Sequence, residues 1–435
     1  MGVPIAEVIA HPRHVRTLGA IQSLIVRLRN LDGPADAYEF QRDLLAHLLD
    51  IETARSGFSR AVKRMRKGGS PQADAPEPET GDLARVETWQ LERDICERAA
   101  RQVRSVGDAL AWRAFNYQRQ FILALCRNQP AGPIAGKDGL LAELDAVDRL
   151  WRDERRFGLL HDLTNCLRIA DLTEFRGHSV LFREIKTNAR RRDPAQLARI
   201  QQTAQALWED RPLPGEGRTA RLVSVDTPLR THLGLLEVAL TRADQEGVFA
   251  VKVPGRRAVL ATDLYGLERQ GWSTAQFQQI SHRRLAAALR RAHADGDRGR
   301  NVSIASSDHV ARDPLRVPWA CYPLEAATCT RLIGDLAWFA VEVSGPGLVE
   351  EMRCAGVDAQ WVVPDDCDGL RPGQAVIRLR GDACAWDVQR SELDRYLLEL
   401  IDLPTWIAGL RQVQRTAPLP GHSWPFYRDE QHVWL

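Results

Sequence analysis

The segment FREIKTN, Phe182 to Asn188, contains a lysine in a chain whose positive charges are almost all arginine. Lysine and arginine together number 59, and only five of them are lysine: Lys63, Lys67, Lys137, Lys186 and Lys252. Because an ammonium and a guanidinium are not interchangeable, a lysine kept in such a chain can mark a place where only a compact charge fits. We interpret four of the five as chance occurrences and single out Lys186 because of its neighbours.

A pair of strands could bring two acidic residues to Lys186. FREIKTN has strand-type spacing, so Glu184 and Lys186 project from one face. The preceding segment CLRIAD predicts a strand that ends at Asp171, and a turn at residues 176–178 would join the two strands as a hairpin. Asp171 is then expected beside Glu184 across the hairpin.

Such an arrangement could bind a metal. Two carboxylates at one point of a sheet repel each other unless a cation neutralises them. Their oxygens suit Mg²⁺ or Mn²⁺, which keep several bound waters. Lys186 could orient or activate one of these waters, or balance charge on a phosphate in the transition state.

The order of acid, hairpin and Glu-x-Lys resembles the PD-(D/E)XK nuclease superfamily, matched here by Asp171, Glu184 and Lys186. The resemblance implies a restriction-endonuclease-like α/β fold: a mixed sheet flanked by helices, with a Mg²⁺ or Mn²⁺ cofactor. It also implies a third acidic ligand, Glu143, on the helix before the hairpin. On the helix after the lysine it implies an assisting residue, for which Gln196 is preferred to Gln201.

The expected element order agrees with that family over residues 136–264. A helix is predicted from Leu140, then the hairpin, then a helix from Pro194, and then the strand RLVSVD. The chain departs from the family name at Ala170, where a proline would stand. Without the resemblance, Glu-x-Lys is also consistent with a solvated strand edge that carries an incidental salt bridge.

Residues just before the hairpin have alternative interpretations. Asp162 is expected to bind backbone amides of its own turn, with a metal ligand as the second interpretation. His161 is expected to be structural rather than a base. Asn165 and Arg168 are candidates for neighbours of the site.

Arginines supply the predicted contacts to nucleic acid. One group follows the lysine and consists of Arg190, Arg191, Arg192 and Arg199. A second lies on a predicted helix, where spacings of seven place Arg283 with Arg290 and Arg284 with Arg291. These side chains could meet phosphates, although charged helix faces and basic loops are often only solvated.

Composition limits the other possibilities. The formal net charge of +2 means that nucleic-acid binding would need a local basic patch. No transmembrane segment and no P-loop, HExxH or GxSxG motif is found. The eight cysteines are scattered without a CxxC pair, which favours reduced thiols in a cytoplasmic protein.

Four regions are predicted along the chain. They are an N-terminal helical segment (1–68), a flexible linker (69–83), a nuclease domain (84–265, with its core at about 136–265) and a C-terminal accessory α+β domain (266–435). The linker contains GGSPQADAPEPETGD, which is too poor in apolar residues to bury a core.

The function favoured by these observations is Mg²⁺-dependent endonucleolytic hydrolysis of DNA, with bacterial genome or anti-phage defence as the setting that the architecture suggests. The alternatives are a non-catalytic nucleic-acid-binding or scaffold protein with a nuclease-like fold, and a nuclease directed at RNA. A homo-oligomer or a partner protein is compatible with either class.

Overall fold

The computed structural model describes residues 5–70, 75–80, 85–126, 131–177, 179–185, 194–214, 219–292, 301–305, 316–364, 370–371, 373–381, 385–416 and 421–434. Lys186, Arg190, Arg191 and Arg192 lie outside these residues, as does the turn residue His178. Helices and strands both occur along the chain, which confirms the predicted mixed α/β class. The restriction-endonuclease-like arrangement stays a prediction.

The chain divides into two units. The first comprises Met1–Arg221 and Val317–Cys321, and the second comprises Leu222–Arg316 and Tyr322–Leu435. The predicted helical segment and the first part of the predicted nuclease range therefore share one unit, and the boundary falls after residue 221.

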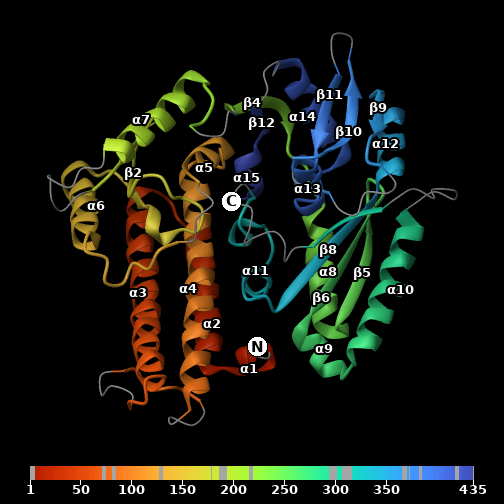
Figure 1. The fold of residues 1–435 in the computed structure, drawn as a ribbon. Helices are drawn as coiled ribbons and strands as arrows, with labels where there is room; N and C mark the ends of the chain where they lie inside the picture. Colours follow the sequence, from red (N-terminus) through yellow and green to blue (C-terminus); the bar gives the residue numbers. More distant parts are fainter. Residues whose placement is uncertain are drawn as a thin grey trace. The chain divides into compact units, whose positions relative to one another are not determined.

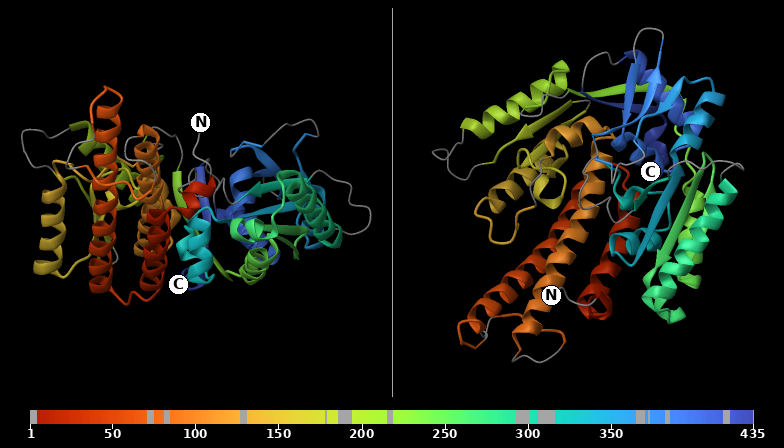
Figure 2. Two further views of the ribbon diagram at one scale, coloured as in Figure 1. Left: turned by 90° about the horizontal axis from the view of Figure 1, so that it is seen from below. Right: turned by 45° about the vertical axis from the view of Figure 1, so that its right-hand side comes forward.

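Helices make up the first part of the first unit. Three of them are long, α2 (Pro12–Arg29), α3 (Pro34–Met65) and α4 (Val86–Ala114), and two are short, α1 (Ile5–Ala10) and α5 (Arg119–Leu125). The helices α2, α3 and α4 lie side by side (Figures 1 and 2). Residues 102–112 of α4 are all buried, polar ones included. Buried polar groups are costly unless they are paired, and Arg104 and Asp108 of α4 pair with the loops that carry the candidate site.

A small sheet follows these helices in the chain. Its elements are α6 (Leu140–Glu154), β1 (Gly158–Leu160), the 3₁₀ turn η1 (His161–Leu163), β2 (Leu172–Arg176), β3 (Ser179–Arg183) and α7 (Pro194–Glu209). The strands run antiparallel in the order β1-β2-β3. Helices begin at Leu140 and Pro194, and the β2–β3 hairpin turns through Gly177, whose φ is 59°. These features agree with the sequence.

One predicted strand is wrong. Residues 164–171, which include all of CLRIAD, form neither helix nor strand, so Asp171 precedes β2 instead of ending a strand. The backbone N–H groups of Arg168 and Ile169 both donate to the Leu125 carbonyl, at 2.8 and 3.1 Å. These contacts with α5 take the donors that a strand would use in its own ladder.

The expected mixed sheet also differs from the observed one. Among the described residues the β1-β2-β3 sheet is wholly antiparallel. The predicted strand RLVSVD forms part of β4 (Thr219–Pro228), which pairs with β12 (Gly421–Arg428) in a separate two-stranded sheet.

The second unit is built on a four-stranded antiparallel sheet in the order β5-β6-β8-β7. Its strands are β5 (Val248–Val253), β6 (Arg257–Asp263), β7 (Asn301–Ala305) and β8 (Ala337–Ser344), and its helices are α8 (Leu233–Glu246), α9 (Leu264–Gln270), α10 (Thr274–Ala292) and α11 (Ala326–Ile333). Every residue of β6 is buried, because α10 and α8 both pack against the sheet at this strand.

The rest of the second unit adds a three-stranded sheet in the order β11-β10-β9. The remaining elements are α12 (Gly345–Cys354), β9 (Ala359–Trp361), β10 (Ala375–Arg380), β11 (Ala385–Gln389), α13 (Arg390–Leu398), α14 (Leu403–Thr416) and α15 (Glu430–Trp434). A further 3₁₀ turn, η4 (Trp319–Cys321), belongs to the first unit. No described helix has the length and apolar character needed to cross a membrane.

Two buried histidines should make the first unit sensitive to acid. Burial is the main cause that lowers the pKa of His14 and of His161 from 6.5 to about 4. Below pH 6.5 the unfolded chain takes up protons that the folded chain resists, so the free energy of unfolding should fall as the pH drops from about 6.5 to about 4.

We expect His14→Gln to remove part of this acid sensitivity, about 1–3 kcal/mol between pH 7 and pH 4.5, because glutamine does not take up a proton in the unfolded chain. Urea unfolding at several pH values would measure it. His47→Gln is the matched control, since His47 is exposed on α3. Equal pH dependence in the wild type and in both variants would contradict the prediction.

Candidate acid site

The ammonium of Lys137 lies at the focus of three carboxylates. Its Nζ is 2.6 Å from Glu143 Oε1, 2.6 Å from Asp162 Oδ2 and 3.7 Å from Asp171 Oδ1. Glu143 and Asp171 were predicted as metal ligands, and the structure brings both to one cation. That cation is a lysine the sequence analysis had assigned to chance, so the interpretation of Lys137 is corrected.

The hairpin brings Asp171 to the backbone beside Glu184, as expected. Leu172 pairs with Arg183, so continuing the register by one residue sets Asp171 opposite Glu184. The Asp171 N–H donates to the Arg183 carbonyl at 3.0 Å, and Asp171 Oδ2 accepts the Ile185 N–H at 2.8 Å. The predicted neighbourhood is therefore observed, although the two acids flank the strands instead of lying within them.

Gln196 reaches Glu184 from the first turn of α7. Its Nε2 donates to Glu184 Oε2 at 2.6 Å. Gln196, the predicted assisting residue, is therefore hydrogen-bonded to Glu184, a predicted metal ligand. The functional role of both residues stays a prediction. The described residues contain no group of three or more His, Cys, Asp or Glu side chains placed to hold a metal ion.

A buried ion pair in the long helices fixes the loop that carries Lys137. Glu52 of α3 and Arg104 of α4 are joined at 2.5 Å and are almost wholly buried. The other Glu52 oxygen accepts the N–H groups of Ile134 and Ala135, at 2.5 and 2.9 Å. Arg104 donates to the carbonyls of Gly132, at 2.8 Å, and of Asp162, at 3.1 Å. One pair thus anchors both the 132–135 loop and the turn that bears Asp162.

The η1 turn is seated on α4. Gly107 lies so close to it that a Cβ there would be 1.9 Å from the Leu163 carbonyl oxygen. Asp108 accepts the backbone N–H groups of Asn165 and Cys166, at 2.6 and 2.9 Å. Burial raises the pKa of Asp108 despite these hydrogen bonds. Asn165 and Cys166 thus serve to hold the turn in place.

The first strand is held by α3. The Gln41 side chain donates to the Gly158 carbonyl at 2.8 Å and accepts the Leu160 N–H at 2.9 Å. The next residue, His161, is buried, and its Nε2 lies 2.7 Å from the Thr173 hydroxyl. These contacts agree with the expected structural role of His161.

The charges of the acid site depend on one another. Burial raises the pKa of Glu143, which is 2% exposed, even though Lys137 acts in the opposite direction. Burial lowers the pKa of Lys137, but its hydrogen bonds to Asp162 and Glu143 outweigh this and raise the pKa overall. The cluster therefore favours the charged form of Lys137, while burial disfavours the ionised form of Glu143.

The predicted arginine contacts fall in different parts of the chain. Arg199 is exposed on α7, in the same unit as the acids. Arg283 and Arg290 are exposed on α10, in the second unit. Arg284 instead contacts Glu246 at 2.9 Å. Of the described candidates, Arg199 alone shares a unit with the acids.

The hairpin carries an arginine cluster that the sequence analysis missed. The fully buried carboxylate of Glu174 is bound by Arg156, Arg176 and Arg183, whose side chains are 38, 41 and 37% exposed. Hydrogen bonds from Arg176 and Arg183 lower the pKa of Glu174 although burial opposes them. A signal was available, because pairing Glu174 with Leu181 places Arg176 and Arg183 on one face with Glu174.

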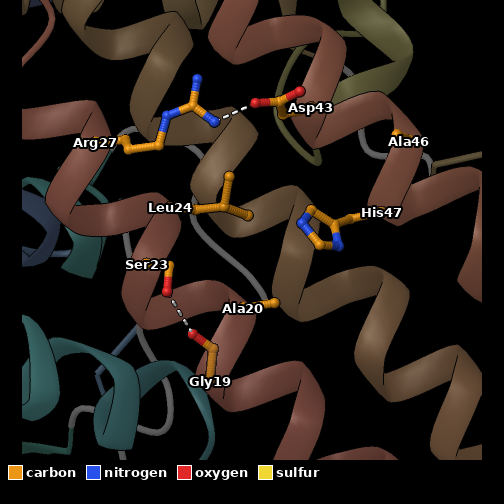
Figure 3. Close-up of a pocket in the computed structure, with 8 residues that line it drawn as sticks. All are labelled: Gly19, Ala20, Ser23, Leu24, Arg27, Asp43, Ala46 and His47. Carbon is orange, nitrogen blue, oxygen red and sulfur yellow. Dashed lines mark hydrogen bonds and ion pairs between the residues drawn. The ribbon is translucent and has the colours of Figure 1, made fainter.

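A separate hollow lies between α2 and α3 (Figure 3). It is lined by Gly19, Ala20, Ser23, Leu24, Arg27, Asp43, Ala46 and His47. Arg27 and Asp43 form an ion pair across it. None of the predicted site residues lines this hollow.

No family model, curated protein or solved structure matches the chain. The nuclease resemblance accordingly stays a prediction, and the functional argument depends on the geometry of the site.

Gly107→Ala should displace η1 and destabilise the protein by about 1–3 kcal/mol or more, because the new Cβ would overlap a backbone oxygen that is itself anchored. Gly19→Ala is the matched control: it is also in a helix, has no atom within 4 Å, and should be neutral or more stable by roughly 0.5–1 kcal/mol. Urea unfolding measures both, and equal stability of the two variants would contradict the proposed seating of η1.

Proposed function

We propose that this protein is a metal-dependent phosphodiesterase that cleaves DNA. The observation that carries the proposal is the convergence of Glu143 and Asp171 on one cation, with Asp171 bound to the backbone next to Glu184. These acids come from a helix and from the two residues that flank a hairpin, Asp171 before β2 and Glu184 after β3, which is the order that the nuclease resemblance requires.

The donor set fits a hard divalent cation. Carboxylate oxygens are the ligands that Mg²⁺ and Mn²⁺ prefer, and the burial of Glu143 favours any cation that keeps it ionised. The observed side chains are drawn to Lys137, so ligation requires them to close around the metal. A bound metal would polarise the phosphoryl group and lower the pKa of a water.

Each residue of the chain has a proposed task. Glu143, Asp171 and Glu184 hold the cation, and Gln196 orients the Glu184 carboxylate through its 2.6 Å hydrogen bond. Lys186, two residues beyond Glu184, positions the attacking water. This role for Lys186 comes from the sequence alone.

Arginines next to the acids are suited to a polyanionic substrate. Each guanidinium carries five N–H donors, and the single carboxylate of Glu174 cannot satisfy those of three arginines. Arg156, Arg176 and Arg183 are each about two-fifths exposed, so their outer donors can meet phosphates. Arg199 on α7, and Arg190, Arg191 and Arg192 before it, extend the proposed contact. A defence nuclease is the biological setting we propose.

One observation favours a second candidate function. Lys137 already neutralises the acids, so the same fold could bind nucleic acid without cleaving it. A cleavage assay distinguishes the two functions, because only the nuclease would cut the nucleic acid that it binds. An RNA substrate stays an alternative because phosphate contacts do not distinguish the sugar.

We expect the purified protein to cleave DNA in the presence of Mg²⁺ or Mn²⁺, and we expect EDTA to abolish this cleavage. Glu143→Gln, Asp171→Asn and Lys186→Ala should each lower the rate by about 10²–10⁴-fold, because each removes a ligand or the group that positions water. Supercoiled plasmid, linear duplex, single-stranded DNA and RNA would be compared as substrates.

The matched control is Asp145→Asn. Asp145 lies on α6, as Glu143 does, but its side chain is 61% exposed and paired with Arg149. It should cleave like the wild type. Cleavage that survives all three site variants, or that persists in EDTA, would reject the proposal, and the absence of cleavage combined with binding would favour the second candidate.

Nucleic-acid binding should depend on the arginine cluster. Arg176→Gln is expected to reduce the slope of log K against log salt by about 0.9 for duplex DNA, because one phosphate contact is lost. Fluorescence anisotropy in EDTA measures this without cleavage. Arg149→Gln, which alters an exposed arginine of α6, should leave the slope unchanged, and equal slopes in both variants would exclude the cluster from the contact surface.

A further inference from the structure

We infer that Lys137 is a built-in competitor of the metal: its ammonium holds the acid site together until a divalent cation displaces it. The inference rests on the proposed function, because it takes Glu143 and Asp171 as metal ligands. It adds a regulatory step to that function, since binding of the cation and release of Lys137 become one event.

The contacts of Lys137 match what a cation needs at this position. An ammonium has three N–H donors, and three carboxylates surround this one. The two short contacts, each 2.6 Å, go to Glu143 and Asp162, so Lys137 joins an acid from α6 to an acid from η1. The chain's own ammonium thereby marks where positive charge is most favourable.

A metal ion and the Lys137 ammonium cannot bind the same carboxylate oxygens at the same time. Mg²⁺ binds oxygen at about 2.0–2.1 Å and demands near-octahedral geometry, so its ligands must close in around it. Glu143 is 2% exposed and its Oε1 is occupied by Lys137. Because Lys137 Nζ occupies this oxygen at 2.6 Å, binding of the metal through Glu143 Oε1 requires Lys137 Nζ to leave.

The fold permits this exchange without unfolding the loop. The Lys137 N–H donates to the Ile134 carbonyl at 3.0 Å, and the Lys137 carbonyl accepts the Leu140 N–H at 3.1 Å. The preceding residues, Ile134 and Ala135, are fixed by Glu52. Only the flexible side chain, already 30% exposed, has to swing away.

The scarcity of lysine makes a direct test practical. With five lysines in the chain, acylation of each can be followed separately by mass spectrometry. We expect Mn²⁺ or Mg²⁺ alone to increase the acylation rate of Lys137 at least fivefold, because the released side chain leaves its carboxylate partners and becomes accessible to the reagent. Lys63 and Lys252 are exposed and serve as internal references, which should not change. An unchanged Lys137 rate at a metal concentration that saturates the site would overturn the inference.

Metal affinity gives a second test. Lys137→Met keeps the length of the side chain but removes its charge, so calorimetry should show Mn²⁺ binding at least tenfold tighter than in the wild type. Lys137→Arg, which keeps the positive charge, should bind Mn²⁺ no more tightly than the wild type. The control Lys252→Met should bind Mn²⁺ with the affinity of the wild type. Equal or weaker binding by a folded Lys137→Met protein would overturn the inference. If that variant does not fold, the acylation test on the wild type still decides.

The two proposals fail in different ways. Metal-dependent cleavage with an unchanged Lys137 acylation rate would reject the competition by Lys137 and would still support the proposed nuclease. A lack of Mn²⁺ binding in the wild type and in folded Lys137→Met rejects the metal site itself, and both proposals with it.

Discussion

The buried ion pair between Glu52 and Arg104 is the interaction on which the candidate site depends. A buried charge is costly unless it is paired and hydrogen-bonded, and both residues meet that need with backbone groups of two distant loops. The same contacts that satisfy the pair also set the loop of Lys137 and the turn of Asp162. Removing one partner would leave the other charge uncompensated and release both loops.

The N-terminal helices are therefore part of the site's support. Gln41, Glu52, Arg104 and Asp108 all belong to α3 and α4, and each binds backbone of β1, of η1 and the residues that follow it, or of the loop before α6. A site built from short strands and turns gains rigidity when its backbone is hydrogen-bonded to long, well-packed helices. The sheet itself is too small to supply this.

Local patterns predicted what local physics determines. The helix starts at Leu140 and Pro194, the turn at Gly177 and the placing of Asp171 beside the end of the next strand could all be read from spacing and turn residues. The CLRIAD segment could not, because the backbone N–H groups of Arg168 and Ile169 bond to the Leu125 carbonyl, far back in the chain. Lys137 was missed for the same reason: its three acidic partners lie 6, 25 and 34 positions later in the chain, and only the folded loop brings them to its ammonium. Its rarity was the one usable signal.

The Gln41 side chain also affects how the sheet meets other molecules. Residues 157 and 161 of the β1 segment direct their hydrogen bonds toward the β2 side, so Gly158 and Leu160 present the outer edge. One glutamine amide fills both positions there, as a neighbouring strand would. Exposed strand edges recruit further strands and lead to aggregation. Gln41 of α3 thus occupies the hydrogen-bonding positions through which β1 would pair with a strand of another chain.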